Sequence, residues 1–350
     1  MQNLLLAHRY FHFSLSRWVA AWDSQAPDER DLERLFKEDI FPRRCLKWEF
    51  PHSLSEAREV HLVLMERELR MGVKYVFEGS MDYPAALLSH IPPERRPAVL
   101  YTRGSPLPSE AEILSVVGTR SPSPDGIDAA RSFSAFFSLL RIHLVSGLAK
   151  GIDTIAHREN LNRGTIAVLG SSLNDIYPAE NFILSEEILA QGGTLLSPFP
   201  GGQVPLPANF PQRNELIAAL STGVLVVEGA EKSGAAITGK LALAMGKSVA
   251  VLSSDFRTPF GRGAVRLAQA GADFVLDEEE ALQALYARLG GFLTGELPLG
   301  GTARRKRSFN LSEFCARSGL DIPPAISLLQ EEILKGRIVR TGPDRYQSKV

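Results

Sequence analysis

The sequence predicts an α/β protein: a Rossmann-like, doubly wound, mostly parallel sheet with an N-terminal helical domain and a C-terminal winged-helix-like domain. From about Ile113, short β-branched runs alternate with helical stretches. Most of these runs are apolar throughout, as in parallel strands that are covered on both faces. The end of the chain follows the order helix, turn, helix and hairpin, which is the order of a winged helix.

The N-terminal part is expected to be helical, for example over Asp31–Phe36 and over Leu54–Met71 with Ser53 as its N-cap. Prolines then predict extended backbone that ends in a short strand at Val99–Tyr101. The predicted divisions are a helical, SAM-like domain over 1–80, an extended connector over 81–110, the Rossmann-like domain over 111–290, a Gly-rich basic linker over 291–307 and the winged-helix-like domain over 308–350.

Within the sheet domain, helices should separate the strands. The expected helices cover Ile127–Leu140, Glu180–Gln191, Asn214–Leu220 with its flanks, and Ala235–Met245. In the tail, Asn310 and Glu313 form a capping box, a second helix follows over Pro324–Lys335, and a hairpin turns at Gly342–Asp344. Winged helices bind duplex DNA or dock proteins, and this pattern leaves both roles open.

Composition excludes several classes of protein. The 350 residues allow two or three domains, and Cys45 and Cys315 suggest neither a disulfide framework nor a zinc site. The start of the chain lacks the pattern of a signal peptide, and no apolar run approaches the ~18 residues of a membrane span. We therefore expect a cytoplasmic protein without a membrane segment.

Charge is distributed unevenly. Residues 111–280 carry 13 basic and 18 acidic side chains, whereas residues 303–350 carry 10 basic and 5 acidic ones. A whole-protein field that attracts polyanions is therefore not expected, although a local basic pocket or tract remains open.

Candidate site residues follow the apolar runs, because ligands of doubly wound folds bind beyond the carboxyl ends of the strands. The candidates in these turns, together with those at the start of the helix near residue 210, are Gly118, Thr119, Arg120, Ser121, Ser146, Gly147, Lys150, Gly151, Gly170, Ser171, Phe210, Arg213, Asn214, Ser233 and Gly234.

Two of these turns have the residues of a phosphate receptor. In GTRS, turn amides and the fork of Arg120 can hold one phosphate, although an ordinary turn with an exposed arginine is the simpler interpretation of this tetrapeptide alone. In SGLAKG, Gly147 and Gly151 permit close approach to a ligand, and Lys150 adds a mobile charge. Asp153 and His157 can pair on the next helix, but a buried structural histidine is the preferred interpretation.

The segment FPQRN brings an aromatic ring and polar groups to a helix start. Phe210 could stack on a base, Arg213 could reach a phosphate, and Asn214 could read a base edge or hold the loop. Taken singly, Phe210 is more often a core residue and Arg213 a solvated cation.

Motifs for other chemistry are incomplete. GAAITGKL lacks the Ser or Thr that a P-loop needs after its lysine, because Leu241 stands there. A GxGxxG fingerprint, a GxSxG elbow and a complete metal-ligand set do not occur. We therefore expect no catalytic residue, no metal and no cofactor.

The order of the motifs resembles the DNA processing protein A (DprA, or Smf) family of bacteria. The motifs are VVGTRS, VSGLAKGIDTIAH, IAVLGSSLNDIYPAEN, FPQRNELIAALS, VLVVEG and SGAAIT, preceded by DYP and PAVLY. The resemblance covers roughly residues 73–277, and SGLAKGID followed by AH is its most specific element.

This resemblance implies a non-enzymatic protein that binds and protects single-stranded DNA and loads the RecA recombinase onto it during natural transformation and recombination. It implies a DNA site around Arg120 and around Phe210, Arg213 and Asn214. It further implies a homodimer formed through the Rossmann-like domain, with RecA contacts near the dimer interface.

The sequence departs from the family pattern at three places. Glu215 stands where the family usually has a second arginine, no lysine precedes Phe210 over Val204–Asn209, and SSDF (253–256) replaces a PGD-like stretch. We expect weaker or more salt-sensitive binding, compensated by Lys150, by dimerisation or by the basic tail.

Two other functions are weighed against this interpretation. A Rossmann-like nucleotide-binding hydrolase would need an acid in the crevice, and Glu228 and Asp153 are the candidates. An interaction scaffold would use the tail alone, and Arg120 would then have no role.

Overall fold

The computed structural model describes residues 1–11, 15–22, 27–38, 43–44, 46, 49–108, 113–252 and 257–286, and the strand residues 308–309, 338–342 and 345–348. They form two compact units, Met1–Leu285 and Tyr286–Val350. The predicted linker, the two predicted tail helices and the SSDF stretch lie outside the described residues.

A nine-stranded sheet is the centre of the first unit, in the order β1-β2-β6-β5-β4-β3-β7-β8-β9. Its strands are β1 (Lys74–Phe77), β2 (Val99–Gly104), β3 (Ile113–Val117), β4 (His143–Ser146), β5 (Ile166–Val168), β6 (Thr194–Ser197), β7 (Gly223–Val226), β8 (Ser248–Leu252) and β9 (Asp273–Val275). The seven strands from β6 to β9 in this order are parallel, whereas β1 and β2 run antiparallel at one edge. The predicted doubly wound, mostly parallel sheet is therefore confirmed.

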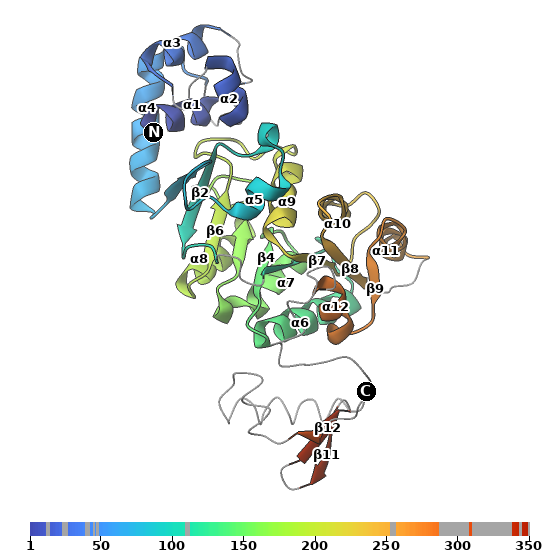
Figure 1. Ribbon diagram of the computed structural model, residues 1–350. Helices are drawn as coiled ribbons and strands as arrows, with labels where there is room; N and C mark the ends of the chain where they lie inside the picture. The colour runs from blue at the N-terminus through green and yellow to red at the C-terminus, as the bar shows by residue number, and fades with distance from the viewer. Residues whose placement is uncertain are drawn as a thin grey trace. The chain divides into compact units, whose positions relative to one another are not determined.

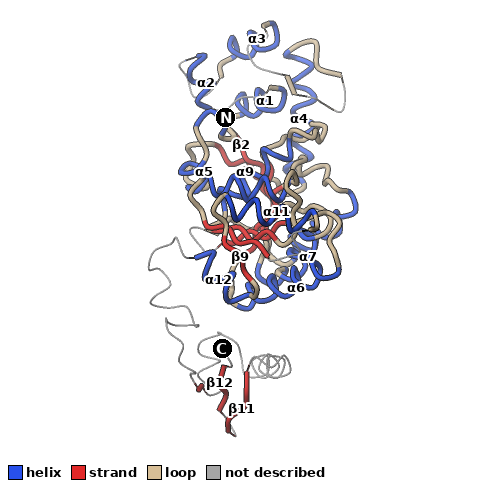
Figure 2. The backbone as a smooth tube through the Cα atoms, turned by 90° about the vertical axis from the view of Figure 1, so that its right-hand side faces the viewer, coloured by secondary structure: helices blue, strands red, loops and turns tan. Residues whose placement is uncertain are grey.

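Helices cover both faces of this sheet (Figures 1 and 2). On one side lie α5 (Ala85–His90), α9 (Asn209–Leu220), α10 (Gly234–Ala244) and α11 (Pro259–Gln269); on the other lie α6 (Pro124–Leu139), α7 (Ile152–Glu159) and α12 (Glu278–Tyr286). The remaining helix of this part is α8 (Phe182–Ala190), and short 3-10 turns occur at η1 (Pro93–Arg95), η2 (Leu161–Arg163) and η3 (Ala179–Asn181). The central strands β3 to β7 are buried almost throughout, which explains why their sequences are continuously apolar.

The strand order reverses around β3. Strands β4, β5 and β6 follow on one side of it, and β7, β8 and β9 on the other. A reversal of this kind leaves a crevice at the carboxyl ends of the neighbouring strands, where ligands of such folds bind.

The N-terminal region is helical, as predicted, with α1 (Gln2–Tyr10), α2 (Leu15–Trp22), α3 (Glu29–Lys37) and α4 (Leu54–Arg70). The Ser53 side chain accepts a hydrogen bond from the Glu56 amide and caps α4 as expected. The region is not separate, however: β1 and β2 belong to the main sheet, and α5 and η1 lie where an extended connector was expected.

A buried polar network explains why these helices and the sheet form one unit. The Arg9 guanidinium on α1 donates to both carboxylate oxygens of Glu68 on α4, at 2.7 and 3.0 Å, and to the Gly201 carbonyl at 2.9 Å. Glu68 also accepts from the Gly201 amide at 3.1 Å and from the Tyr75 hydroxyl at 2.8 Å. Arg9 and Glu68 are 0% and 1% exposed, so α1 and α4 close over the loop that precedes α9.

In the second unit, β11 (Ile338–Gly342) and β12 (Arg345–Ser348) form the predicted antiparallel hairpin, and β10 (Ser308–Phe309) pairs with β12. The strands of a winged helix are thus present.

Candidate functional site

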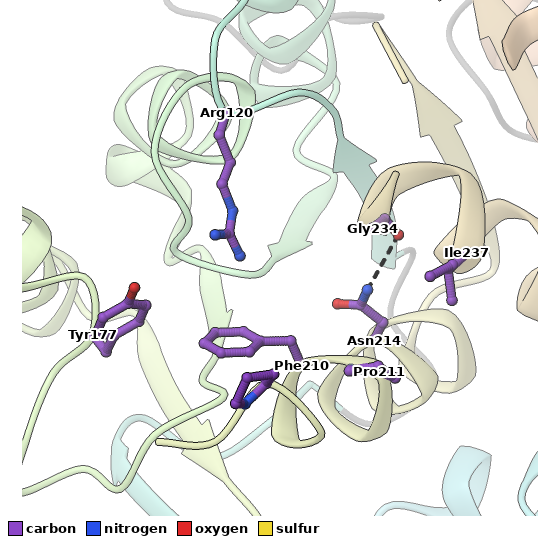
Figure 3. A pocket seen from close by; sticks show the side chains of 8 residues that line it. Arg120, Tyr177, Phe210, Pro211, Asn214, Gly234 and Ile237 are labelled. Carbon is purple, nitrogen blue, oxygen red and sulfur yellow. Dashed lines mark hydrogen bonds between the residues drawn. The ribbon is translucent and has the colours of Figure 1, made fainter. Parts of the chain in front are cut away.

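The turns after β3 and β5 meet the starts of α9 and α10 at the carboxyl ends of the strands and surround a hollow of 380 Å³ (Figure 3). Its lining residues are Arg120, Tyr177, Pro207, Phe210, Pro211, Asn214, Gly234 and Ile237. A second hollow of 40 Å³ is lined by Arg120, Gly147, Ala149, Lys150, Tyr177, Pro178, Phe210 and Arg213. The structure therefore brings together candidates from four separate segments of the sequence.

The first two turns pack directly on each other. The Ile152 amide donates to the Thr119 carbonyl at 3.2 Å, and a Cβ at Gly151 would lie 2.4 Å from that carbonyl oxygen. Gly151 also has φ +76°, so a side chain is disfavoured there on both grounds. A Cβ at Gly118 would clash with Ile152, which makes this glycine a packing residue.

Arg120 extends from this turn into the hollow (Figure 3). Its side chain is exposed, and its Cζ atom lies 5.4 Å from the ring centre of Phe210. Among the described residues, its guanidinium makes no hydrogen bond or ion pair. Thr119 accepts a hydrogen bond from the Ser121 amide at 3.3 Å and shapes the turn. Arg120 thus presents a positive charge that is available to an anionic ligand.

The SGLAKG loop is held by buried side chains of α7. Asp153 accepts from the Gly147 and Ala149 amides at 3.1 and 3.3 Å, and His157 Nε2 accepts from the Leu148 amide at 3.3 Å. The two side chains thus do not pair with each other. Burial raises the pKa of Asp153 and lowers that of His157 to about 3, so the imidazole is neutral. The preferred interpretation of His157 as a structural histidine is confirmed.

Leu148 has an unusual backbone conformation in this loop. Its φ is 55°, in the left-handed region, while its side chain is fully buried. The Asn181 side chain donates to the Leu148 carbonyl at 2.8 Å, while the Leu148 amide donates to His157. Ser146, just before the loop, is also buried and donates to the Val116 carbonyl at 2.7 Å, so it joins β4 to β3. These contacts fix the loop before any ligand binds.

Lys150 was expected to compensate for missing positive charge. Its Nζ atom instead lies 2.5 Å from Glu180 Oε1, and both side chains are more than half exposed. The hydrogen bond to Lys150 lowers the pKa of Glu180, which therefore stays ionised. Lys150 lines the smaller hollow, but in this arrangement a neighbouring carboxylate balances its charge.

Phe210 lies in the first turn of α9 between the two hollows. Its ring covers Gly170, where a Cβ would come within 2.8 Å of it. The Asn209 side chain donates to the Gly170 carbonyl at 3.1 Å and fixes the helix start against the end of β5. The absence of a side chain at Gly170 therefore leaves the space that the Phe210 ring occupies.

The sequence suggested that Arg213 is a solvent-exposed or phosphate-binding cation, but the structure places it among backbone carbonyls. It is only 5% exposed and donates to the carbonyls of Gly147 and of Val168, the latter at 2.7 Å. Burial lowers its pKa to about 10, which still leaves it charged at neutral pH. The helix begins at Asn209 rather than near Asn214, and this earlier start turns Arg213 toward the strand ends.

Asn214 holds the loops, one of the two roles considered for it. It accepts from Arg213 Nε at 3.0 Å and donates to the Gly234 carbonyl at 3.1 Å (Figure 3). Ser233 caps α10 by accepting from the Ala236 amide at 3.2 Å. The residues at the start of α10 thus form the wall opposite Tyr177.

Tyr177 is a lining residue that the sequence analysis did not identify. Its ring centre is 5.7 Å from that of Phe210, it is 44% exposed, and it lines both hollows. The candidate Ser171 is buried, and its hydroxyl accepts a hydrogen bond from the Tyr177 amide at 3.2 Å. Ser171 therefore holds the backbone of Tyr177 in place. The signal in the sequence was a tyrosine shortly after a strand end, within NDIYP.

The acidic residues have structural contacts. Glu228 accepts from the amide of Ser123, at 3.0 Å, and from its hydroxyl at the start of α6. Glu215 pairs with Arg95 on η1 at 3.0 Å and lines neither hollow, so the residue that stands in place of the family's second arginine does not face the crevice. Burial raises the pKa of Glu215. Within the described residues, no group of three or more His, Cys, Asp or Glu side chains is placed to hold a metal ion.

The fold and the site define a class: a Rossmann-like protein with an aromatic and cationic crevice at the switch point of its sheet, suited to anionic ligands with flat rings. Residues 74–286 match the family model described as DNA recombination-mediator protein A. The chain belongs to this family, which is the DprA/Smf family.

Curated relatives agree. The chain is 40% identical over 191 residues to Protein Smf of Escherichia coli K12, covering 54% of this chain and 51% of the relative. It is 34% identical over 220 residues to DNA processing protein DprA of Bacillus subtilis 168, covering 62% of this chain and 73% of the relative. The chain thus spans about half the length of the first curated relatives that it matches.

Solved structures agree as well. The X-ray structure of DprA from Streptococcus pneumoniae superposes with a TM-score of 0.59 at 26% identity, covering 81% of this chain and 93% of that one. DNA processing protein A from Helicobacter pylori, described for its unique single-stranded DNA binding mode, has a TM-score of 0.53 at 27% identity and covers 61% of this chain and 97% of that one. In the part of our chain that the structure describes, no helix is both long and apolar enough to cross a bilayer.

Proposed function

We propose that this protein binds single-stranded DNA at the crevice formed by Arg120 and Phe210, protects the strand and loads the RecA recombinase onto it in natural transformation and recombination. The observation that carries the proposal is the exposed guanidinium of Arg120, which lies 5.4 Å from the ring centre of Phe210 and lines with it a hollow of 380 Å³. A cation beside an aromatic ring suits a strand that offers a phosphate and a base at each step, without regard to sequence.

The contacts of the acidic residues support a binding role over hydrolysis. Asp153 accepts two backbone amides of the SGLAKG loop, and Glu228 accepts from Ser123 at the start of α6. Each carboxylate thus has a structural use, and neither lines either hollow. We therefore propose a non-catalytic protein that acts where DNA and the recombinase meet, in the cytoplasm.

A homodimer through the Rossmann-like domain is part of the proposal. Strand β9 is the edge of the sheet, and on and just after it Phe274 and Leu276 are 49% and 75% exposed. An exposed edge strand with apolar side chains is a surface that pairs readily with another chain. Light scattering of the wild type and of Phe274→Glu tests this: a dimer that becomes a monomer in the variant is the expected result.

The binding experiment compares labelled oligo-dT with labelled duplex by fluorescence anisotropy over a salt series. We expect preferential binding of the single strand. Arg120→Ala should weaken binding of all sequences about equally and reduce the slope of log K against log salt by about 0.7, the contribution of one phosphate contact in a single strand.

Arg158→Ala is the matched control, because Arg158 is an exposed arginine on α7 that lines neither hollow. Equal losses in the two variants, or no binding of oligo-dT by the wild type at low salt, would overturn the proposal. RecA loading is then tested as filament formation on a strand already coated with single-strand-binding protein.

A further inference from the structure

Tyr177 is placed as an exposed aromatic ring at the rim of the crevice. It is 44% exposed, and its ring lies at 58° to the ring of Phe210. Its hydroxyl makes no hydrogen bond with the described residues. Burial alone does not account for this position, because nearly half of a large flat side chain faces solvent beside the hollow.

The backbone around Tyr177 is anchored, so the ring is held in place. The Tyr177 amide donates to the buried hydroxyl of Ser171. Four residues later, Asn181 donates to the Leu148 carbonyl at 2.8 Å and to the Thr154 hydroxyl at 2.9 Å. A ring whose backbone is fixed in this way loses little further freedom when it contacts a ligand.

The two hollows differ in what they can hold. The larger one, at 380 Å³, has the size of a pocket for a small ligand, whereas the smaller one, at 40 Å³, has room for about one water molecule. A strand that leaves the larger hollow past Tyr177 therefore passes over the smaller one without inserting a base. The tilted rings of Tyr177 and Phe210, 5.7 Å apart, also leave no room for a base between them.

We propose that Tyr177 is a second stacking platform, which receives the base next to the one on Phe210 as the strand passes toward Lys150. This inference rests on the proposed function and adds a residue and a direction to it. Phe210 and Arg120 hold one nucleotide in the larger hollow, and the exposed face of Tyr177 takes its neighbour. Stacking on an aromatic face tolerates any base, in keeping with binding that ignores sequence.

The test measures oligo-dT affinity of Tyr177→Ala, Tyr177→Phe and Phe210→Ala by anisotropy. Loss of one stacked base should weaken binding by Tyr177→Ala about 5- to 150-fold. Tyr177→Phe should stay within about twofold of the wild type, because it keeps the ring and removes only a hydroxyl that makes no hydrogen bond with the residues that the structure describes. Phe182→Ala is the matched control, because Phe182 is 54% exposed, near in the chain, and lines neither hollow.

A direct readout separates stacking from a structural effect. Tyr177→Trp adds an indole to the three tryptophans of the chain, and the emission that it adds to that of the wild type should be quenched when oligo-dT binds, whereas the emission added by Phe182→Trp should show no such quenching. Wild-type affinity in Tyr177→Ala together with loss in Phe210→Ala would overturn this inference and leave the proposed function standing. No binding by the wild type would remove both. Equal losses in Tyr177→Ala and Phe182→Ala would also overturn the assignment.

Discussion

Glu68→Gln removes the negative charge from the buried pair that joins α1 and α4 to the sheet. Glutamine keeps the size of the side chain and an oxygen that can accept from the Gly201 amide, so the change acts mainly on charge. Arg9 is 0% exposed and would then hold its positive charge without a counterion. We expect a large loss in the free energy of unfolding when one carboxylate oxygen of Glu68 is replaced by an amino group.

The magnitude follows from the burial of both partners. Breaking a buried pair by removing one partner costs about 3–5 kcal/mol, because the other charge stays desolvated. The Arg9 guanidinium keeps its hydrogen bond to the Gly201 carbonyl at 2.9 Å, which favours the lower half of that range. On the same helix, Glu66 pairs with Arg70, and both side chains are more than 60% exposed. Glu66→Gln should therefore cost only about 0.3–0.5 kcal/mol.

Urea denaturation of the wild type and the two variants measures both free energies of unfolding. Arg9→Met combined with Glu68→Met should recover part of the loss, because it leaves no unpaired buried charge. The recovery should be incomplete, since Tyr75 and both backbone groups of Gly201 lose their partners. A cost below about 1 kcal/mol for Glu68→Gln would refute the reasoning and would mean that water reaches this pair.

Three further predictions concern the crevice and its surroundings. Gly170→Ala should lower oligo-dT affinity at least fivefold, because its Cβ would lie 2.8 Å from the Phe210 ring. Fluorescence anisotropy measures this affinity, and the control variant Arg158→Ala should bind as the wild type does. Glu215→Arg should leave the dissociation constant for oligo-dT within about twofold of the wild-type value. It should lower the free energy of unfolding by about 1–3 kcal/mol, because the new arginine would face Arg95. A clear gain in oligo-dT affinity would contradict the position of Glu215 outside the crevice. His157 is neutral in the fold with a pKa of about 3 against 6.5 when unfolded, so the unfolded state binds the extra proton and stability should fall as pH drops from about 6.5 to 3. His157→Gln should make that fall shallower by up to about 1.4 kcal/mol per pH unit in urea titrations, and an unchanged slope would contradict the burial.

The place of the site could be predicted from sequence because it depends on local patterns. Apolar runs define parallel strands, their ends share one edge, and Arg120 and Gly151 follow two of those ends. The role of Arg213 could not be predicted, because it depends on where α9 begins and on carbonyls of β5 and the loop after β4. The same limit applies to Glu215, whose partner Arg95 precedes it by more than a hundred residues.

The union of the helical region with the sheet was also beyond the sequence patterns. Helical spacing identified α3 and α4, but nothing local indicates that Arg9 pairs with Glu68 or contacts Gly201, which is 192 positions away. Residues that form buried charge pairs across such separations leave no periodic pattern in the sequence. Only the folded chain brings them together.

The left-handed leucine of the SGLAKG loop bears on which strands should bind best. A leucine with φ 55° costs about 1–2 kcal/mol of backbone energy, yet burial of its side chain and the bonds to His157 and Asn181 hold it there. In the proposed complex the loop is therefore already ordered before binding, and the entropy lost on binding falls on the strand. Strands that are unstructured in solution, such as oligo-dT, lose only flexibility, whereas self-stacked purine tracts must also separate their own bases. A preference for pyrimidine tracts would then originate in the nucleic acid and would require no base-reading group in the crevice.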